Sequence, residues 1–164
     1  ILLARGIPVG LPSKLLGEYG AVTLRAVLER IGGVAHRVKR SKLKAARNKA
    51  RLKVWPGGQD QEAVTLAWSE GGVLLTHDAK CRDMARALKV PTLDLVDLLA
   101  YGVRRGVLTA AELEEAMARL PGPPPFAWQP PDAPEPPYSP AALIAERGER
   151  HAEKVDAALD GLAG

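Results

Sequence analysis

Short apolar segments alternate with helical segments between residues 60 and 101, and this alternation restricts the fold more than any other feature of the sequence. Residues 60–70 have the apolar spacing of a helix, and Gly71 begins a glycine pair that stops it. Residues 73–75 are long enough for a buried strand but too short for a helix. The same order is predicted to repeat as helix, strand and helix at residues 82–89, 90–93 and 94–101. This pattern predicts an α/β fold with helices packed on a mainly parallel sheet.

One strand and one helix are predicted before this region, and a further helix is predicted after it. Apolar residues recur at helical spacing over residues 14–31, and residues 7–11 form a strand candidate. Thr109 and Glu112 have the spacing of a capping box, which starts another helix. We therefore expect one compact domain over residues 1–120.

The segment 121–140 cannot continue that domain, because ten of its twenty residues are proline. Such a composition favours extended, partly stiff chain. Phe126, Trp128 and Tyr138 are embedded in it, so we expect the segment to lie on the domain surface or on the partner subunit of a homodimer. Residues 141–164 are predicted to form a C-terminal helical tail.

The cysteine content points to a reducing compartment. Cys81 is the single cysteine, which excludes an internal disulfide bond, and its place between Lys80 and Arg82 would favour the thiolate. No catalytic base lies near Cys81 in the sequence, so we do not expect it to be a nucleophile. No signal peptide or apolar run of about 18 residues is present. We therefore expect a cytoplasmic protein without a membrane partner.

One basic segment, residues 36–53, dominates the charge distribution. It contains nine cations and no acid, namely Arg37, Lys39, Arg40, Lys42, Lys44, Arg47, Lys49, Arg51 and Lys53. A solvated helix face is one explanation, but like charges in such number gain most when a polyanion neutralises them. A nucleic acid is therefore the predicted partner of this segment. No aromatic residue is interleaved among the cations, so we expect contact with phosphates rather than base stacking.

Carboxylates are the remaining candidates for chemistry. The sequence contains no glycine-rich phosphate loop, CxxC pair, HExxH or GxSxG motif. The three histidines are far apart and are expected to be polar surface or hinge residues, namely His36, His77 and His151. The strand at 73–75 is followed by Thr76, His77 and Asp78, and side chains just past the carboxyl end of a strand line the ligand crevice of an open parallel sheet. Asp60 opens the helix before that strand, and Glu18 lies early in the helix at 14–31.

Carboxylates that meet in one crevice repel each other unless a hard divalent cation lies among them. Mg²⁺ or Mn²⁺, held by acids and waters, is the usual ion in such a site. It can generate hydroxide and stabilise the displacement at a phosphodiester. The sequence therefore predicts a metal site formed by Glu18, Asp60 and Asp78. For Glu18, a solvated carboxylate beside a helix N-terminus is the alternative.

Four segments together resemble the later four-fifths of a PIN domain over about residues 1–120: PSKLLGEY, DQEAVTLAWSEGGVLLTHDAK, ARALKVPTLDLVDLL and RGVLTAAELEEAMARL. PIN domains include many metal-dependent ribonucleases and the toxin components of bacterial and archaeal toxin–antitoxin pairs. The resemblance implies a three-layer α/β/α fold with a central parallel sheet. It also implies Mg²⁺- or Mn²⁺-dependent endoribonuclease activity and, for a toxin-type nuclease, an antitoxin-like protein partner.

The resemblance also implies roles for individual residues. Glu18 matches the acid on the helix after the second strand, and Asp60 matches the acid that opens the helix before the later strand. Thr76 and Asp78 match the T-x-D that follows this strand, in which the threonine positions the site by hydrogen bonding. Glu62 is an alternative to Asp60 in another helix register, and Asp83 is a more distant candidate.

The chain departs from the family pattern at its start. PIN domains begin with a strand that ends in aspartate, whereas this chain has no Asp before Asp60. We expect either that this strand belongs to an N-terminal piece before Ile1 or that one metal ligand has been lost. In the second case the chain is a non-catalytic nucleic-acid-binding or protein-interaction module on the same fold.

Overall fold

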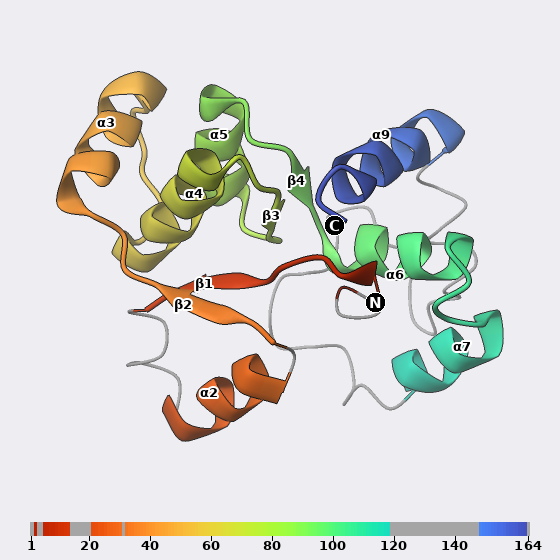
Figure 1. The fold of residues 1–164 in the computed structure, drawn as a ribbon. Helices are drawn as coiled ribbons and strands as arrows, with labels where there is room; N and C mark the ends of the chain where they lie inside the picture. Colours follow the sequence, from red (N-terminus) through yellow and green to blue (C-terminus); the bar gives the residue numbers. More distant parts are fainter. Residues whose placement is uncertain (1, 3–4, 14–20, 31, 119–147, 164) are drawn as a thin grey trace.

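The computed structural model describes residues 2, 5–13, 21–30, 32–118 and 148–163. Its elements, in chain order, are β1 (Gly10–Pro12), α2 (Ala21–Arg30), β2 (Val34–His36), α3 (Arg40–Ala50), α4 (Gly58–Glu70), β3 (Leu74–Leu75), α5 (Ala79–Leu88), β4 (Thr92–Leu93), α6 (Leu95–Arg104), α7 (Ala110–Ala118) and α9 (Glu149–Asp160). Figure 1 shows their arrangement. The predicted α/β class with parallel strands is confirmed. The proline-rich segment 121–140 lies outside the described residues.

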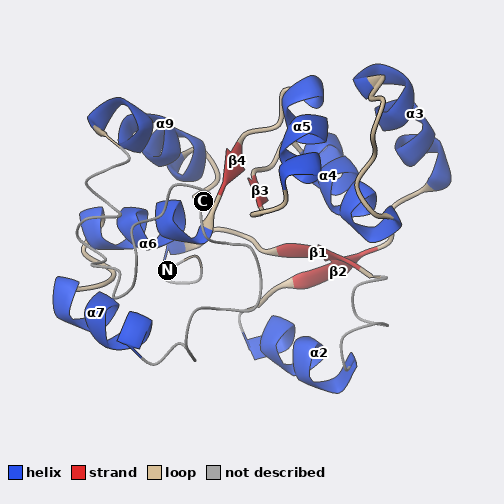
Figure 2. Cartoon of the chain, turned by 180° about the vertical axis from the view of Figure 1, so that it is seen from behind, coloured by secondary structure: helices blue, strands red, loops and turns tan. Residues whose placement is uncertain are grey.

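The described strands form two small parallel sheets. Strand β1 pairs with β2, with Gly10 opposite Val34, and β3 pairs with β4, with Leu74 opposite Thr92. Figures 1 and 2 show α2 on one side of the β1–β2 pair and α4 on the other. A helix–sheet–helix arrangement therefore exists around this pair, whereas a single continuous central sheet is not seen among the described strands.

Local signals in the sequence start and stop several of these helices. Helix α4 ends at Gly71, which has the left-handed conformation (φ 67°) expected of a glycine stop. Helix α7 begins with the predicted capping box: the Thr109 N–H donates to Glu112 Oε2 at 2.8 Å, and the Glu112 N–H donates to Thr109 Oγ1 at 3.2 Å. Helix α5 begins at Ala79, earlier than predicted, because the Asp78 side chain caps it.

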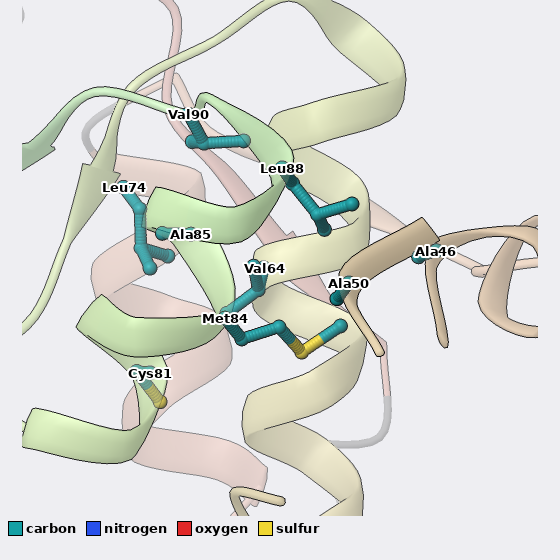
Figure 3. Close-up of a cluster of buried hydrophobic side chains, with 9 residues drawn as sticks. All are labelled: Ala46, Ala50, Val64, Leu74, Cys81, Met84, Ala85, Leu88 and Val90. Carbon is teal, nitrogen blue, oxygen red and sulfur yellow. The ribbon is translucent and has the colours of Figure 1, made fainter. Parts of the chain in front are cut away.

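The first hydrophobic cluster joins α3, α4, α5 and β3 (Figure 3). Its buried members are Ala46, Ala50, Val64, Leu74, Cys81, Met84, Ala85, Leu88 and Val90. The two alanines form the buried face of α3, and their small side chains let α3 approach α4 closely. The cations of α3 consequently remain on its outer side. This cluster fixes the positions of both helices that carry the candidate aspartates.

The second hydrophobic cluster joins the C-terminal helix α9 to β4 and α6. Val155 and Leu159 of α9 are buried there with Ile7, Leu93 and Tyr101. Polar contacts surround this cluster: Tyr101 donates to Asp160 Oδ1 at 2.7 Å, and both Arg104 and Arg105 pair with Asp156. The Tyr101 hydrogen bond is the main cause that lowers the pKa of Asp160, with the charges of Arg105 and Arg5 adding to it. Helix α9 therefore packs as part of the folded body.

Helix α5 ends in a strained residue, which leads to a stability prediction. Lys89 is left-handed (φ 61°), a conformation that costs a residue with a Cβ about 1–2 kcal/mol. We expect Lys89→Gly to raise the free energy of unfolding by about 0.5–1 kcal/mol, because glycine removes the strain but also gains freedom in the unfolded chain. Urea denaturation measures this change. Arg86→Gly, inside the same helix, should lower the free energy of unfolding by about 1 kcal/mol. A change of the same sign in both variants would contradict strain at Lys89.

Candidate functional site

Two of the predicted acids lie at helix N-termini. Asp60 is in the first turn of α4, and Asp78 is the N-cap of α5; both are exposed. The two side chains therefore lie at the starts of two helices that pack on the same core.

The turn before α4 shapes the position of Asp60. Gly57 is the N-cap of α4, and a Cβ at this position would lie 3.0 Å from Asp60 Oδ2. The Asp60 carboxylate is thus folded back over the helix start, where glycine leaves room for it. The neighbouring Gln61 is buried and stabilises the same turn, because its Nε2 donates to the Pro56 carbonyl oxygen at 2.7 Å.

Hydrogen bonds fix the position of Asp78. Its Oδ1 accepts from the Cys81 N–H at 2.7 Å, which is the capping bond of α5. Its own N–H donates to Thr76 Oγ1 at 3.1 Å. Thr76 therefore stabilises the turn between β3 and α5.

The Cys81 thiol lies behind the start of α5. It is buried, and burial is the main cause that raises its pKa to about 12. The charge of Asp60 raises it further, as do the hydrogen bond and charge of Asp78. The thiolate predicted from the neighbouring Lys80 and Arg82 is therefore not favoured, because burial and these carboxylates oppose it.

The other candidate acids differ in their positions. Glu18 lies outside the described residues. Glu62 is 5% exposed and is therefore enclosed within the packing around α4 rather than open to solvent. Asp83 is on the outer side of α5 and pairs with Arg86 at 3.1 Å. Of the predicted acids that the structure describes, Asp60 and Asp78 are the two that are exposed at helix starts.

The chemistry of this pair suits a hard cation. Within the described residues, no group of three or more His, Cys, Asp or Glu side chains is arranged to hold a metal ion. Two carboxylates suffice for Mg²⁺, which commonly keeps several waters and takes further oxygens from substrate phosphates. Asp60 and Asp78 therefore offer oxygens of the type that such an ion takes.

The basic segment forms the exposed side of α3 and its flanks. All nine predicted cations are exposed. Two of them contact polar side chains of α4: Lys42 Nζ lies 3.0 Å from Glu70 Oε1, and Arg47 Nε donates to Gln61 Oε1 at 2.6 Å. The hydrogen bond from Lys42 is the main cause that lowers the pKa of Glu70. Arg47 and Gln61 thereby connect the basic helix to the turn that carries Asp60.

Aromatic rings lie beside this basic segment. They were not predicted from the sequence of the segment alone. Lys49 Nζ lies 5.2 Å from the ring centroid of Trp68, which belongs to α4. Trp55 lies two residues after the segment and, like Trp68, packs partly buried against the first hydrophobic cluster. The cations are therefore accompanied by two tryptophans, one of them brought in by the fold.

Two histidines have partners in the structure. The His77 Nε2 accepts from the Leu95 N–H at 3.3 Å, beside the start of α6. The His151 Nε2 of α9 lies 2.7 Å from Oδ1 of the buried Asp97. Both contacts join elements that are distant in sequence. No local pattern around either histidine indicates them.

Comparisons with protein-family models, with curated proteins and with solved structures found no match to this chain. Among the described helices, none combines the length and the apolar character needed to cross a lipid bilayer.

The raised pKa of Cys81 predicts how stability changes with pH. The thiol has an ordinary pKa of 9.0 and a folded-state pKa of about 12, so burial of the neutral thiol contributes fully below pH 9 and is lost as the pH rises toward 12. We expect the wild type to lose stability relative to Cys81→Ala above pH 9. Urea denaturation of both proteins from pH 7 to pH 11 measures the difference. A difference that stays constant above pH 9 would show that the thiol is not held neutral.

Proposed function

We propose that this chain is a Mg²⁺- or Mn²⁺-dependent endoribonuclease of PIN type. The observation that supports the proposal most strongly is the placement of two acids: Asp60 lies in the first turn of α4 and Asp78 caps α5, and the first hydrophobic cluster packs these two helices together. Two anions that meet at one site are unfavourable unless a cation or a proton compensates them. A hard divalent cation compensates them and supplies the chemistry of phosphodiester hydrolysis.

Asp60 and Asp78 would hold the ion, and Glu18 would be the third ligand. When bound, the ion would polarise the scissile phosphate and lower the pKa of an attacking water. The Cys81 N–H fixes one oxygen of Asp78, and Thr76 fixes the backbone before it. The neutral Cys81 thiol supplies no competing nucleophile at neutral pH, because its pKa is about 12.

The α3 segment would hold the RNA. Its cations are exposed, and the Arg47–Gln61 hydrogen bond connects them to the turn of Asp60. Phosphates held along α3 would therefore approach the start of α4. Contacts of this kind position the strand without reading its sequence, and their strength falls as salt rises.

A PIN-type fold would make the two strand pairs parts of one sheet. Both pairs are parallel, and α2 and α4 already lie on opposite sides of the β1–β2 pair. A strand pairing with both would complete the three-layer arrangement that the resemblance implies.

Cleavage of a labelled single-stranded RNA by the full chain tests the proposed activity. We expect cleavage with Mn²⁺ or Mg²⁺ and none with EDTA. Cleavage that persists in EDTA, or RNA binding without cleavage in either metal, would reject the metal-dependent nuclease.

The second candidate is a non-catalytic nucleic-acid-binding module on the same fold. It is favoured by the lack of a third His, Cys, Asp or Glu ligand beside Asp60 and Asp78 within the described part of the chain. This candidate predicts RNA binding that is independent of metal, together with no cleavage. The assay with and without EDTA therefore separates the two functions.

A further inference from the structure

The loop between α3 and α4 combines apolar and cationic residues at the surface. It contains Val54, which is 62% exposed, between the exposed Lys53 and the partly buried Trp55. Exposure of a large apolar side chain is unfavourable in water. A single exposed valine is ordinary. Val54, however, stands next to a tryptophan at the end of a run of cations, so the surface here is both apolar and positively charged.

Several contacts fix the shape of this loop. At its start, Arg51 is left-handed (φ 49°) and its N–H donates to the Arg47 carbonyl oxygen at 3.1 Å. At its end, the buried Gln61 binds the Pro56 carbonyl oxygen at 2.7 Å. Between them, Trp55 packs against the first hydrophobic cluster. The loop is therefore held in place before a ligand arrives, which reduces the entropy lost on binding.

We propose that the loop of residues 51–56 contacts the unpaired bases of single-stranded RNA, and we call it the base-contact loop. Val54 and Trp55 would pack against bases, while Arg51 and Lys53 would bind the flanking phosphates. Because RNA is taken as the ligand, the proposal rests on the function proposed above. It adds that unpaired bases, and not the phosphate backbone alone, are recognised.

The mixture of residue types selects this ligand over others. A double helix covers the faces of its bases, so it would engage the cations and leave Val54 without a partner. A single strand offers both phosphates and exposed base faces, which stack on aromatic rings with little sequence preference. An acidic polypeptide would match the charge but offers no base faces. Charge complementarity and apolar exposure together therefore favour single-stranded RNA.

A neighbouring ring extends the same surface. Lys49 Nζ lies over Trp68, 5.2 Å from its centroid, so one ring face already carries a cation. The face of the ring attracts the cation. The cation is thereby held in a position from which it can contact a phosphate. Trp68 is thus expected to support Lys49, whereas the base contacts come from Val54 and Trp55.

Fluorescence anisotropy in EDTA tests the proposal without cleavage. Four probes are used: a single-stranded RNA, an abasic oligomer of the same length, a duplex RNA, and poly-glutamate as a competitor. We expect the wild type to bind the single strand about tenfold more tightly than the abasic oligomer. Val54→Ser combined with Trp55→Leu should remove about this factor from single-strand binding and leave the affinity for the abasic oligomer unchanged.

Two control variants separate the loop from the rest of the surface. Lys44→Gln, on α3, should weaken all nucleic-acid probes similarly and lower the salt slope by about one. Val54→Ser alone should keep the wild-type melting temperature, because Val54 is exposed, and still lose part of the base-dependent affinity.

The outcomes distinguish this proposal from the proposed function. Equal wild-type affinity for the single strand and the abasic oligomer, or an unchanged single-strand affinity in Val54→Ser with Trp55→Leu, would overturn the base contacts and leave phosphate binding intact. Poly-glutamate that displaces RNA at equal charge concentration would also overturn them. Failure to bind any nucleic acid would reject both proposals.

Discussion

Asp78→Asn is expected to lower the RNA cleavage rate by about a hundredfold or more while leaving the fold intact. Loss of one anionic ligand would weaken the proposed metal site, and metal catalysis supplies several kcal/mol of transition-state stabilisation. A factor of ten corresponds to about 1.4 kcal/mol. Stability should hardly change, because asparagine caps helices as well as aspartate does, and its amide oxygen can still accept from the Cys81 N–H.

A matched control exists at another helix start. Glu112 is an exposed acid at the start of α7, bonded to the Thr109 N–H at 2.8 Å. Figure 1 places α7 away from α5. Glu112→Gln makes the same change from acid to amide, so it should leave cleavage unchanged. If Asp78→Asn cleaves at the wild-type rate, Asp78 is not a metal ligand.

The largest stability effect is expected at the centre of the first hydrophobic cluster. Met84 is 0% exposed and lies between α5 and α4 beside Val64 (Figure 3). We expect Met84→Ala to lower the free energy of unfolding by about 2–5 kcal/mol, because it removes buried apolar contacts and leaves a cavity. Urea denaturation followed by circular dichroism measures this loss.

Met84→Leu is the matched control for this prediction. Its side chain is similar in volume, so the expected loss is below about 1.5 kcal/mol. Since the first hydrophobic cluster joins the helices that carry Asp60 and Asp78, Met84→Ala should also reduce cleavage at temperatures where Met84→Leu stays active. A loss below about 1 kcal/mol in Met84→Ala would show that this packing is not the core of the domain.

The features predicted correctly from sequence are those set by short-range chemistry. Gly71 ends α4 because glycine adopts the left-handed conformation without a steric penalty. Thr109 and Glu112 start α7 because their side chains reach backbone N–H groups within one turn. Asp78 was correctly predicted to follow a strand, and its capping of α5 follows from the same local geometry.

The features that were missed depend on contacts between distant segments. Trp68 reaches Lys49 only because α4 packs against α3. The sequence of residues 36–53 alone therefore does not indicate this aromatic partner. The effect of the Asp60 charge on the pKa of Cys81 likewise depends on the packing of α4 against α5, whereas Asp78 acts within the start of α5. Strand pairing is also long-range, and strands of two or three residues carry too little pattern to set sheet order.

Electron paramagnetic resonance of Mn²⁺ measures how tightly the full chain binds the ion. This measurement tests the proposed shared metal site most directly. We expect saturable binding that Asp60→Asn and Asp78→Asn each weaken about tenfold or more, whereas Glu112→Gln does not change it. Because both acids would hold the same ion, the double variant should lose less than the product of the two single effects. Mn²⁺ binding that is unaffected by both single substitutions would contradict a metal site at Asp60 and Asp78.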